Sequence, residues 1–179
     1  MKKVIYVLMV LLVVVSGLVF ANRAINKEAS KKTASKPPTA AEMEAGRKAW
    51  LATPEGMKYA KWEASPEGQK VYASAAKISA NVRNYTNMEA VVTSLSLPPG
   101  SRLGFGLMAR INGENYIVTF EPEKSQLEQL QSLKVNDKII IRAHYMSNAP
   151  KYSYLIVRGE YVERDGKVIF QRVPRKGGC

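Results

Sequence analysis

The sequence predicts an α+β protein with an apolar N-terminal segment, a short helical region and a C-terminal β domain. Three observations support this prediction. An uncharged run begins at Val4, a twelve-residue repeat lies within residues 39–85, and hydrophobic residues alternate with polar ones from Thr86 onward. The chain therefore divides into a membrane-targeting segment over 1–21, a tether over 22–38, a helical region over 39–85, a β domain over 86–174 and a flexible tail over 175–179.

Residues 1–21 have the features of a bacterial signal peptide. Lys2 and Lys3 precede the apolar run over residues 4–21, and small residues follow its centre. The same run lies near the short end of the roughly 17–25 residues that span a bilayer, so an uncleaved anchor stays open as the alternative. Basic residues flank both ends of the run, which leaves either orientation of such an anchor open. Both interpretations predict an exported or membrane-anchored protein of the bacterial periplasm or cell envelope.

Most of the excess positive charge lies near this segment. The formal net charge is +12, and residues 1–40 carry seven basic side chains against one acidic side chain. The tether over residues 22–38 lacks apolar periodicity, which is typical of a disordered segment. A basic segment beside a membrane attracts anionic lipid at about 1 kcal/mol per residue. We therefore expect the membrane to be a partner, through residues 4–21 and the basic tether.

Residues 39–85 have a helical pattern that contains an internal repeat. Thr39 and Glu42 have the spacing of a capping box. Trp-Leu-Ala-Thr-Pro-Glu-Gly-Met-Lys begins at Trp50, and Trp-Glu-Ala-Ser-Pro-Glu-Gly-Gln-Lys begins at Trp62. In each copy Thr or Ser suits an N-cap, Pro suits the first helical position and Glu complements the helix dipole. Each copy should start a new helix, with its tryptophan packed at the corner; an exposed partner-binding edge is the alternative.

The pattern changes to alternation at residue 86. Asn112-Gly113 and Asp165-Gly166 are strong signals for hairpin turns. The expected strands cover residues 88–97, 102–111, 114–120, 138–146, 152–162 and 167–173, and one helix is expected over 123–133. In the second of these strands one face is apolar and carries Leu103, Phe105, Leu107, Ala109 and Ile111.

The order of three strands, one helix, and then a strand and a hairpin resembles the OB-fold. That fold is a five-stranded Greek-key β-barrel, here with the helix between strands three and four. The resemblance covers residues 86–173 at the level of the fold. It implies a face near strands two and three that binds oligonucleotides, oligosaccharides or peptides. An SH3-like barrel is the competing interpretation, and the intervening helix counts against it.

Four residues of the predicted barrel are candidates for ligand binding: Arg110, Arg142, Tyr154 and Arg158. Each arginine alternates with apolar residues, and an unpaired charge is costly inside a small barrel, so the arginines should face outward. Basic and aromatic side chains together suit single-stranded nucleic acid or an anionic oligosaccharide. However, residues 86–173 carry eleven basic and nine acidic side chains, so their net charge is only +2.

The residue types argue against catalysis. His144 is the only histidine and Cys179 is the only cysteine, so a histidine metal cluster or a Cys–His pair lacks its partners. We expect no enzymatic activity, no metal and no cofactor. The sequence instead predicts a non-catalytic, envelope-associated binding or assembly protein with a protein partner in the envelope. The alternative is an extracytoplasmic binder of single-stranded nucleic acid or of an anionic oligosaccharide.

Overall fold

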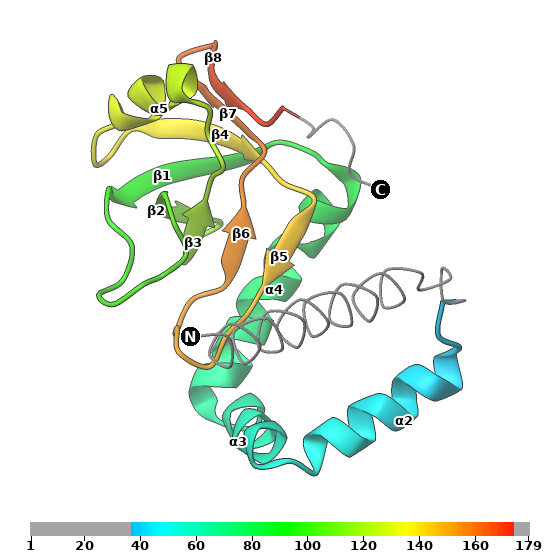
Figure 1. Ribbon diagram of the computed structural model, residues 1–179. Helices are drawn as coiled ribbons and strands as arrows, with labels where there is room; N and C mark the ends of the chain where they lie inside the picture. The colour runs from blue at the N-terminus through cyan, green and yellow to red at the C-terminus, as the bar shows by residue number, and fades with distance from the viewer. Residues whose placement is uncertain (1–36, 174–179) are drawn as a thin grey trace, which may run out of the picture. The chain divides into compact units, whose positions relative to one another are not determined.

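The computed structural model describes residues 37–173, and within them the predicted α+β class is confirmed (Figure 1). The helices are α2 (Ala40–Leu51), α3 (Pro54–Glu63), α4 (Pro66–Asn84) and α5 (Lys124–Gln131). The strands are β1 (Met88–Ser94), β2 (Gly106–Ile111), β3 (Glu114–Thr119), β4 (Lys138–Arg142), β5 (Tyr145–Ser147), β6 (Ile156–Arg158), β7 (Tyr161–Arg164) and β8 (Lys167–Gln171). The predicted targeting segment, most of the tether and the tail with Cys179 lie outside the described residues. Within the described part, no helix is long and apolar enough to cross a membrane.

The helix starts follow the local signals in the sequence. Thr53 Oγ1 accepts a hydrogen bond from the Gly56 N–H at 3.1 Å, and Ser65 Oγ accepts one from the Gly68 N–H at 3.2 Å. Both residues are the N-caps of their helices, with proline at the following position, as predicted. In α2, Thr39 and Glu42 form the predicted reciprocal capping box.

The two tryptophans of the repeat belong to one row of aromatic rings. The ring centroids of neighbouring members lie 5.4, 5.5 and 6.2 Å apart, in the order Trp50, Tyr59, Trp62 and Tyr72. Trp62 packs against the hydrophobic core, as predicted for a helix corner. Trp50 is 45% exposed, so only one of the two tryptophans is mainly a packing residue.

Helix α4 shares one hydrophobic core with the sheet. Its buried residues Val71, Ile78 and Val82 belong to the same cluster as the inward side chains of the strands. The buried Tyr116 of β3 donates a hydrogen bond to the Ser74 carbonyl at 2.9 Å, and its burial raises the pKa of Tyr116 to about 12. Accordingly, the compact unit that holds the sheet begins at Ala49, ahead of the predicted boundary at residue 86.

The eight strands form one mixed sheet in the order β5-β6-β3-β2-β1-β4-β7-β8. Strands β3 and β6 are parallel, and the other neighbouring pairs are antiparallel. Both predicted hairpin turns are present, β2 to β3 and β7 to β8. The predicted helix between the third and fourth strands is α5.

The sheet differs from the predicted five-stranded barrel, because it has eight strands and is not closed into a barrel. The strands expected over 138–146 and 152–162 are each interrupted, which gives β4 and β5, and β6 and β7. The second interruption lies at Gly159, where a Cβ atom would lie 2.4 Å from the Phe120 ring. The Gly159 N–H donates to the Thr119 carbonyl of β3, whereas the Glu160 N–H donates to the Arg142 carbonyl of β4. The backbone therefore changes its pairing partner at this point.

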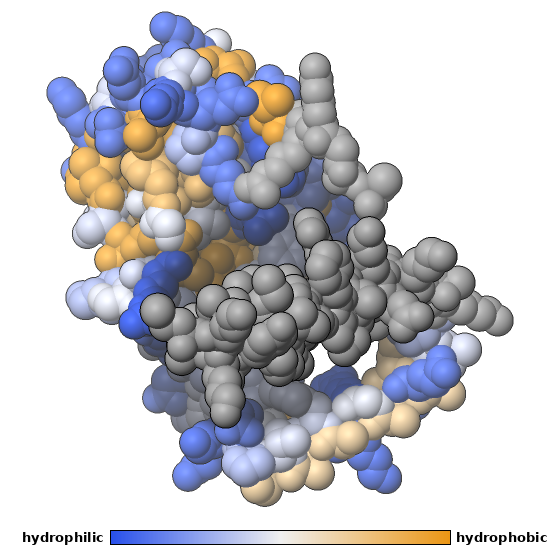
Figure 2. Space-filling view, in the orientation of Figure 1, coloured by the Kyte–Doolittle hydropathy of each residue, from blue (hydrophilic) through white to orange (hydrophobic). Residues whose placement is uncertain are grey.

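The predicted second strand is also shorter than expected, because β2 begins at Gly106. Leu107, Ala109 and Ile111 lie in the main core as predicted, and Phe105 packs against it. Leu103 instead packs against a second cluster. On the face shown in Figure 2, hydrophobic side chains gather near the end of β1, and hydrophilic ones gather around α5 and the β7–β8 hairpin.

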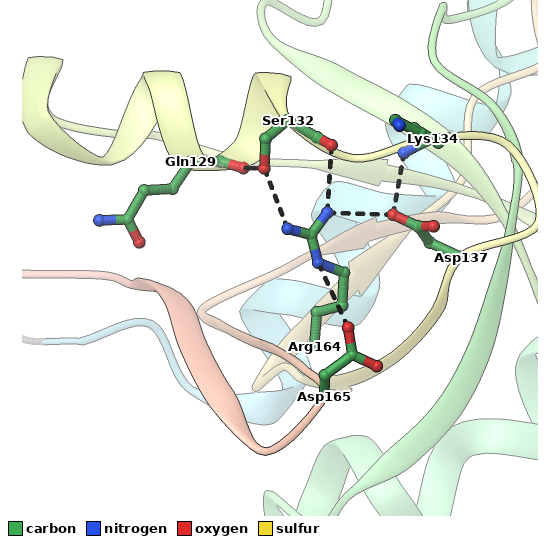
Figure 3. A network of polar contacts seen from close by, with 6 residues as sticks. All are labelled: Gln129, Ser132, Lys134, Asp137, Arg164 and Asp165. Carbon is green, nitrogen blue, oxygen red and sulfur yellow. Dashed lines mark hydrogen bonds and ion pairs between the residues drawn. The ribbon is translucent and has the colours of Figure 1, made fainter.

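A polar network fixes the turn between α5 and β4 to the β7–β8 hairpin (Figure 3). Arg164 Nη1 donates to the Ser132 carbonyl and to Asp137 Oδ2, both at 3.1 Å. The same Asp137 oxygen accepts the Lys134 N–H at 2.9 Å. The Lys134 N–H, and then the Arg164 guanidinium, hold the pKa of Asp137 below its ordinary value.

Replacing Asp137 should therefore make stability less dependent on pH. A carboxyl group whose pKa is lower in the folded state stabilises the fold above its unfolded pKa, and this contribution is lost as pH falls through the folded pKa. We expect Asp137→Asn to lower the free energy of unfolding by about 1.5 kcal/mol near neutral pH, and by less at a pH of about 2, as measured by urea unfolding. The control Asp165→Asn changes a carboxylate that is 90% exposed and should cost under about 0.5 kcal/mol. An Asp137→Asn deficit that is equal at both pH values would contradict this assignment.

Candidate binding surface

The hairpin formed by β4 and β5 with β6 and β7 carries the same short motif on both sides. Arg142-Ala-His-Tyr145 lies on one side, and Arg158-Gly-Glu-Tyr161 lies on the other. In the antiparallel register Arg142 is opposite Tyr161, and Tyr145 is opposite Arg158. The guanidinium carbons lie 4.4 Å from the Tyr161 ring centroid and 5.7 Å from the Tyr145 ring centroid. Two arginine–tyrosine pairs therefore lie on one hairpin.

A histidine–carboxylate pair lies between these two pairs. His144 Nδ1 is 2.7 Å from Glu160 Oε2. The His144 ring stacks on Tyr85, with centroids 4.0 Å apart and planes at 9°. Tyr85 follows α4 in the left-handed conformation, with φ of 52°, which directs the chain into β1. Burial, and then the charge of Glu160, raise the pKa of Tyr85, so its hydroxyl stays protonated near neutral pH.

Ion pairs connect this centre to the second arginine. Arg172 Nη1 is 3.2 Å from Glu160 Oε1, and Arg172 Nε is 3.7 Å from Glu121 Oε2. Arg158 Nη2 lies 3.6 Å from the other oxygen of Glu121. At the first arginine, Arg142 Nε donates to Asn87 Oδ1 at 2.6 Å. These contacts hold the guanidinium groups in place, which reduces the entropy lost when a ligand binds.

We call this region the Arg–Tyr surface, and its members are Arg142, His144, Tyr145, Arg158, Glu160 and Tyr161. Tyr145 is 55% exposed, and the His144 side chain is 59% exposed. Beside Tyr145 and Arg158 lies a pocket of about 160 Å³, which also has Leu103, Phe120 and Ile156 in its lining. The surface therefore offers ring faces, charged hydrogen-bonding groups and a small apolar recess.

Arg110 lies apart from the Arg–Tyr surface, in a groove of about 570 Å³. The groove lies over β1 and its neighbours, between the Asn112-Gly113 turn and the Asp165-Gly166 turn. Its charged lining residues are Glu89, Arg110, Lys138, Glu163 and Asp165. Within residues 37–173, no hydrogen bond, ion pair or ring contact joins any two of Arg110, Arg142, Tyr154 and Arg158.

Tyr154 belongs to a third place, the second hydrophobic cluster. The buried members of this cluster are Met108, Ile117, Tyr152 and Ile156. Tyr152 donates a hydrogen bond to Ser101 Oγ at 3.2 Å, and Lys151 Nζ donates to the Gly100 carbonyl. Two loops, 95–105 and 148–155, thus join beside this cluster. The loops and apolar side chains occupy part of the face where the OB resemblance predicts a ligand.

Of the four predicted residues, Arg142 and Arg158 share a hairpin, whereas Arg110 and Tyr154 lie elsewhere. The sequence pattern identifies Arg142 as a candidate but does not identify the nearby Tyr161, Glu160 and Tyr85. The repeated Arg-Xaa-Xaa-Tyr spacing was the available signal, because an antiparallel hairpin can set the arginine of each copy opposite the tyrosine of the other.

The arrangement suits binding by stacking and charged hydrogen bonds. Tyrosine and arginine are enriched in the central residues of protein interfaces, because they bury a large area and also form hydrogen bonds. No protein-family model, curated protein or solved structure matches this chain, so the functional argument rests on this geometry.

Proposed function

We propose that this chain is a non-catalytic binding or assembly protein of the bacterial cell envelope and that the Arg–Tyr surface contacts a protein partner. The observation that carries the proposal is the pair of arginine–tyrosine contacts around His144 and Glu160 on one hairpin. Half-exposed rings and fixed guanidinium groups are the residue types that dominate binding energy at protein interfaces.

The charge balance favours a protein partner over nucleic acid. Arg142, Arg158 and Arg172 lie among the carboxylates Glu121, Glu160 and Glu163. A single-stranded nucleic-acid site instead requires a groove with a net positive charge. The second candidate is an extracytoplasmic binder of single-stranded nucleic acid or an anionic oligosaccharide. The exposed Tyr145 ring beside the small pocket favours the oligosaccharide.

We also propose that the β domain is OB-like. Strands β1, β2 and β3 are consecutive antiparallel neighbours, β4 pairs with β1, and β6 pairs in parallel with β3. Strand β4 also pairs with β7, and β5 pairs with β6, so the interrupted hairpin touches both sides of the three-stranded unit. With α5 between β3 and β4, this pairing pattern supports the Greek-key arrangement of an OB-fold.

The envelope location rests on the predicted targeting segment over residues 1–21. As a cleaved signal it would export the chain, and as an anchor it would hold the chain at the membrane beside the basic tether. Full-length chain recovered from the soluble cytosolic fraction would contradict this location.

The partner-binding role predicts a specific loss on substitution. We expect Tyr145→Ser combined with Arg158→Ser to reduce binding of an envelope protein by about tenfold or more, because both side chains would lie at the contact. The measurement is quantitative mass spectrometry of envelope proteins retained on immobilised wild-type or variant full-length chain. Arg47→Ser, which changes an exposed arginine of α2, is the matched control.

Titrations with single-stranded DNA and with an anionic glycan test the second candidate. Phosphate contacts lose affinity steeply as salt rises, whereas contacts to a protein partner need not do so. Equal retention of every envelope protein by the wild-type and double-variant chains would exclude the partner role of the Arg–Tyr surface. Salt-sensitive DNA or glycan binding that the double variant loses would replace it with the second candidate.

A further inference from the structure

The groove over β1 separates its charges by sign into two rows. Val91 lies between Arg110 on β2 and Lys138 on β4 in the strand register. The register likewise places Ile140 between Glu89 on β1 and Glu163 on β7. All six residues line the groove of about 570 Å³. One row is thus cationic and the next is anionic, and each is centred on an apolar residue.

The charged groups of the two rows do not neutralise one another. Among residues 37–173, no hydrogen bond or ion pair is formed by the side chains of Glu89, Arg110 or Lys138. Glu163 accepts a hydrogen bond from the Tyr161 hydroxyl at 2.6 Å, which orients its carboxylate. Asp165, at the edge of the groove, lies 3.9 Å from Arg164. The groove therefore keeps donors and acceptors of opposite charge available to a ligand.

The spacing of the rows defines the size of that ligand. Glu89 and Val91 are two residues apart on β1, and so are Lys138 and Ile140 on β4, which sets the rows about 6.5–7 Å apart along the strands. Two extended residues of a peptide span at most about 7 Å. A purely anionic ligand bound at the arginine and the lysine would lie close to the carboxylate row. A purely cationic ligand bound at the carboxylates would lie close to the arginine and the lysine. Each would therefore be repelled by like charge.

We propose that this groove binds a short zwitterionic peptide, about two residues long, by both of its ends. The peptide carboxylate lies at Arg110 and Lys138, and the ammonium lies at Glu89 and Glu163. Apolar side chains of the peptide pack on Val91 and Ile140. This site borders the Arg–Tyr surface, because Glu163 accepts its hydrogen bond from Tyr161, but it does not depend on the protein partner proposed there.

The probe is leucyl-leucine, added to the full-length chain in a micelle of non-ionic detergent and followed by calorimetry and NMR. We expect saturable binding that weakens by about tenfold when either end is capped, as in leucyl-leucine amide or acetyl-leucyl-leucine, because each cap removes one charge-assisted contact. Tetraleucine should also bind more weakly by about tenfold, because its ends lie too far apart to reach both rows.

Two single substitutions separate the rows. Arg110→Gln should reduce the advantage of leucyl-leucine over its amide, because Lys138 alone then remains to bind the free carboxylate. Glu89→Gln should likewise reduce the advantage of the free ammonium, because Glu163 alone then remains to bind it. Arg102→Gln is the matched control and should change neither preference, and a thermal melt verifies that each variant is folded. Failure of leucyl-leucine to bind, equal binding of the capped peptides to wild type, or an unchanged cap preference in both variants would overturn the proposal.

Discussion

A fragment that begins at Thr86 is expected to lose the cooperative thermal melt of the β domain, whereas a fragment that begins at Ala49 should keep it. Without α4 the sheet loses the buried side chains of Val71, Ile78 and Val82, and β3 loses the acceptor for its Tyr116 hydroxyl. Each large buried aliphatic side chain contributes about 1.5–3 kcal/mol, and domain stability is only about 5–15 kcal/mol. Circular dichroism of fragments 86–173 and 49–173 during heating measures the difference.

A point substitution tests the same contact in the intact chain. Ile78 is fully buried, so Ile78→Ala should lower the free energy of unfolding by about 2–5 kcal/mol. Ala80→Ser, at an exposed position on the same helix, is the control and should cost under about 0.5 kcal/mol. If fragment 86–173 melts cooperatively with a β spectrum, the domain boundary that the sequence places at residue 86 would be confirmed.

The parts of the fold that depend on neighbours in the sequence could be predicted. The caps at Thr53 and Ser65 and the turns at Asn112-Gly113 and Asp165-Gly166 each need only a few adjacent residues. The twelve-residue spacing of the repeat fixed the helix corners for the same reason.

The parts that depend on distant partners could not be predicted. Alternation in a strand indicates that Arg110 and Arg142 face away from the core, but only the strand order shows that they have different neighbours. The docking of α4 depends on Tyr116 and Ile78, which lie far apart in the sequence. The interruption at Gly159 depends on the Phe120 ring, which alternation within one strand does not reveal.

Helix propensity and steric packing predict opposite effects on stability when the glycine of the repeat is replaced by alanine. Gly68 lies in the first turn of α4, where propensity alone favours alanine by about 1 kcal/mol. A Cβ atom at this position would lie 2.2 Å from the Trp62 carbonyl oxygen and 3.0 Å from its carbonyl carbon. These are backbone atoms, so no side-chain rotation can relieve the contact. The same oxygen accepts the Ser65 N–H at 2.9 Å and the Ser65 hydroxyl at 2.7 Å, so moving it disrupts the helix corner.

We therefore expect Gly68→Ala to lower the free energy of unfolding by about 3 kcal/mol, measured by urea unfolding of the full-length chain. Gly56→Ala repeats the test at the preceding corner, where the Cβ atom would lie 2.1 Å from the Trp50 carbonyl oxygen. Its cost should be smaller, because α3 buries only Gly56 itself whereas α4 carries part of the main core. The control is Gly46→Ala in α2, where nothing lies within 4 Å of the added atom and no loss of stability is expected. Stabilisation by Gly68→Ala would mean that the corner relaxes freely, and close backbone approach would then not explain the glycine in the repeat.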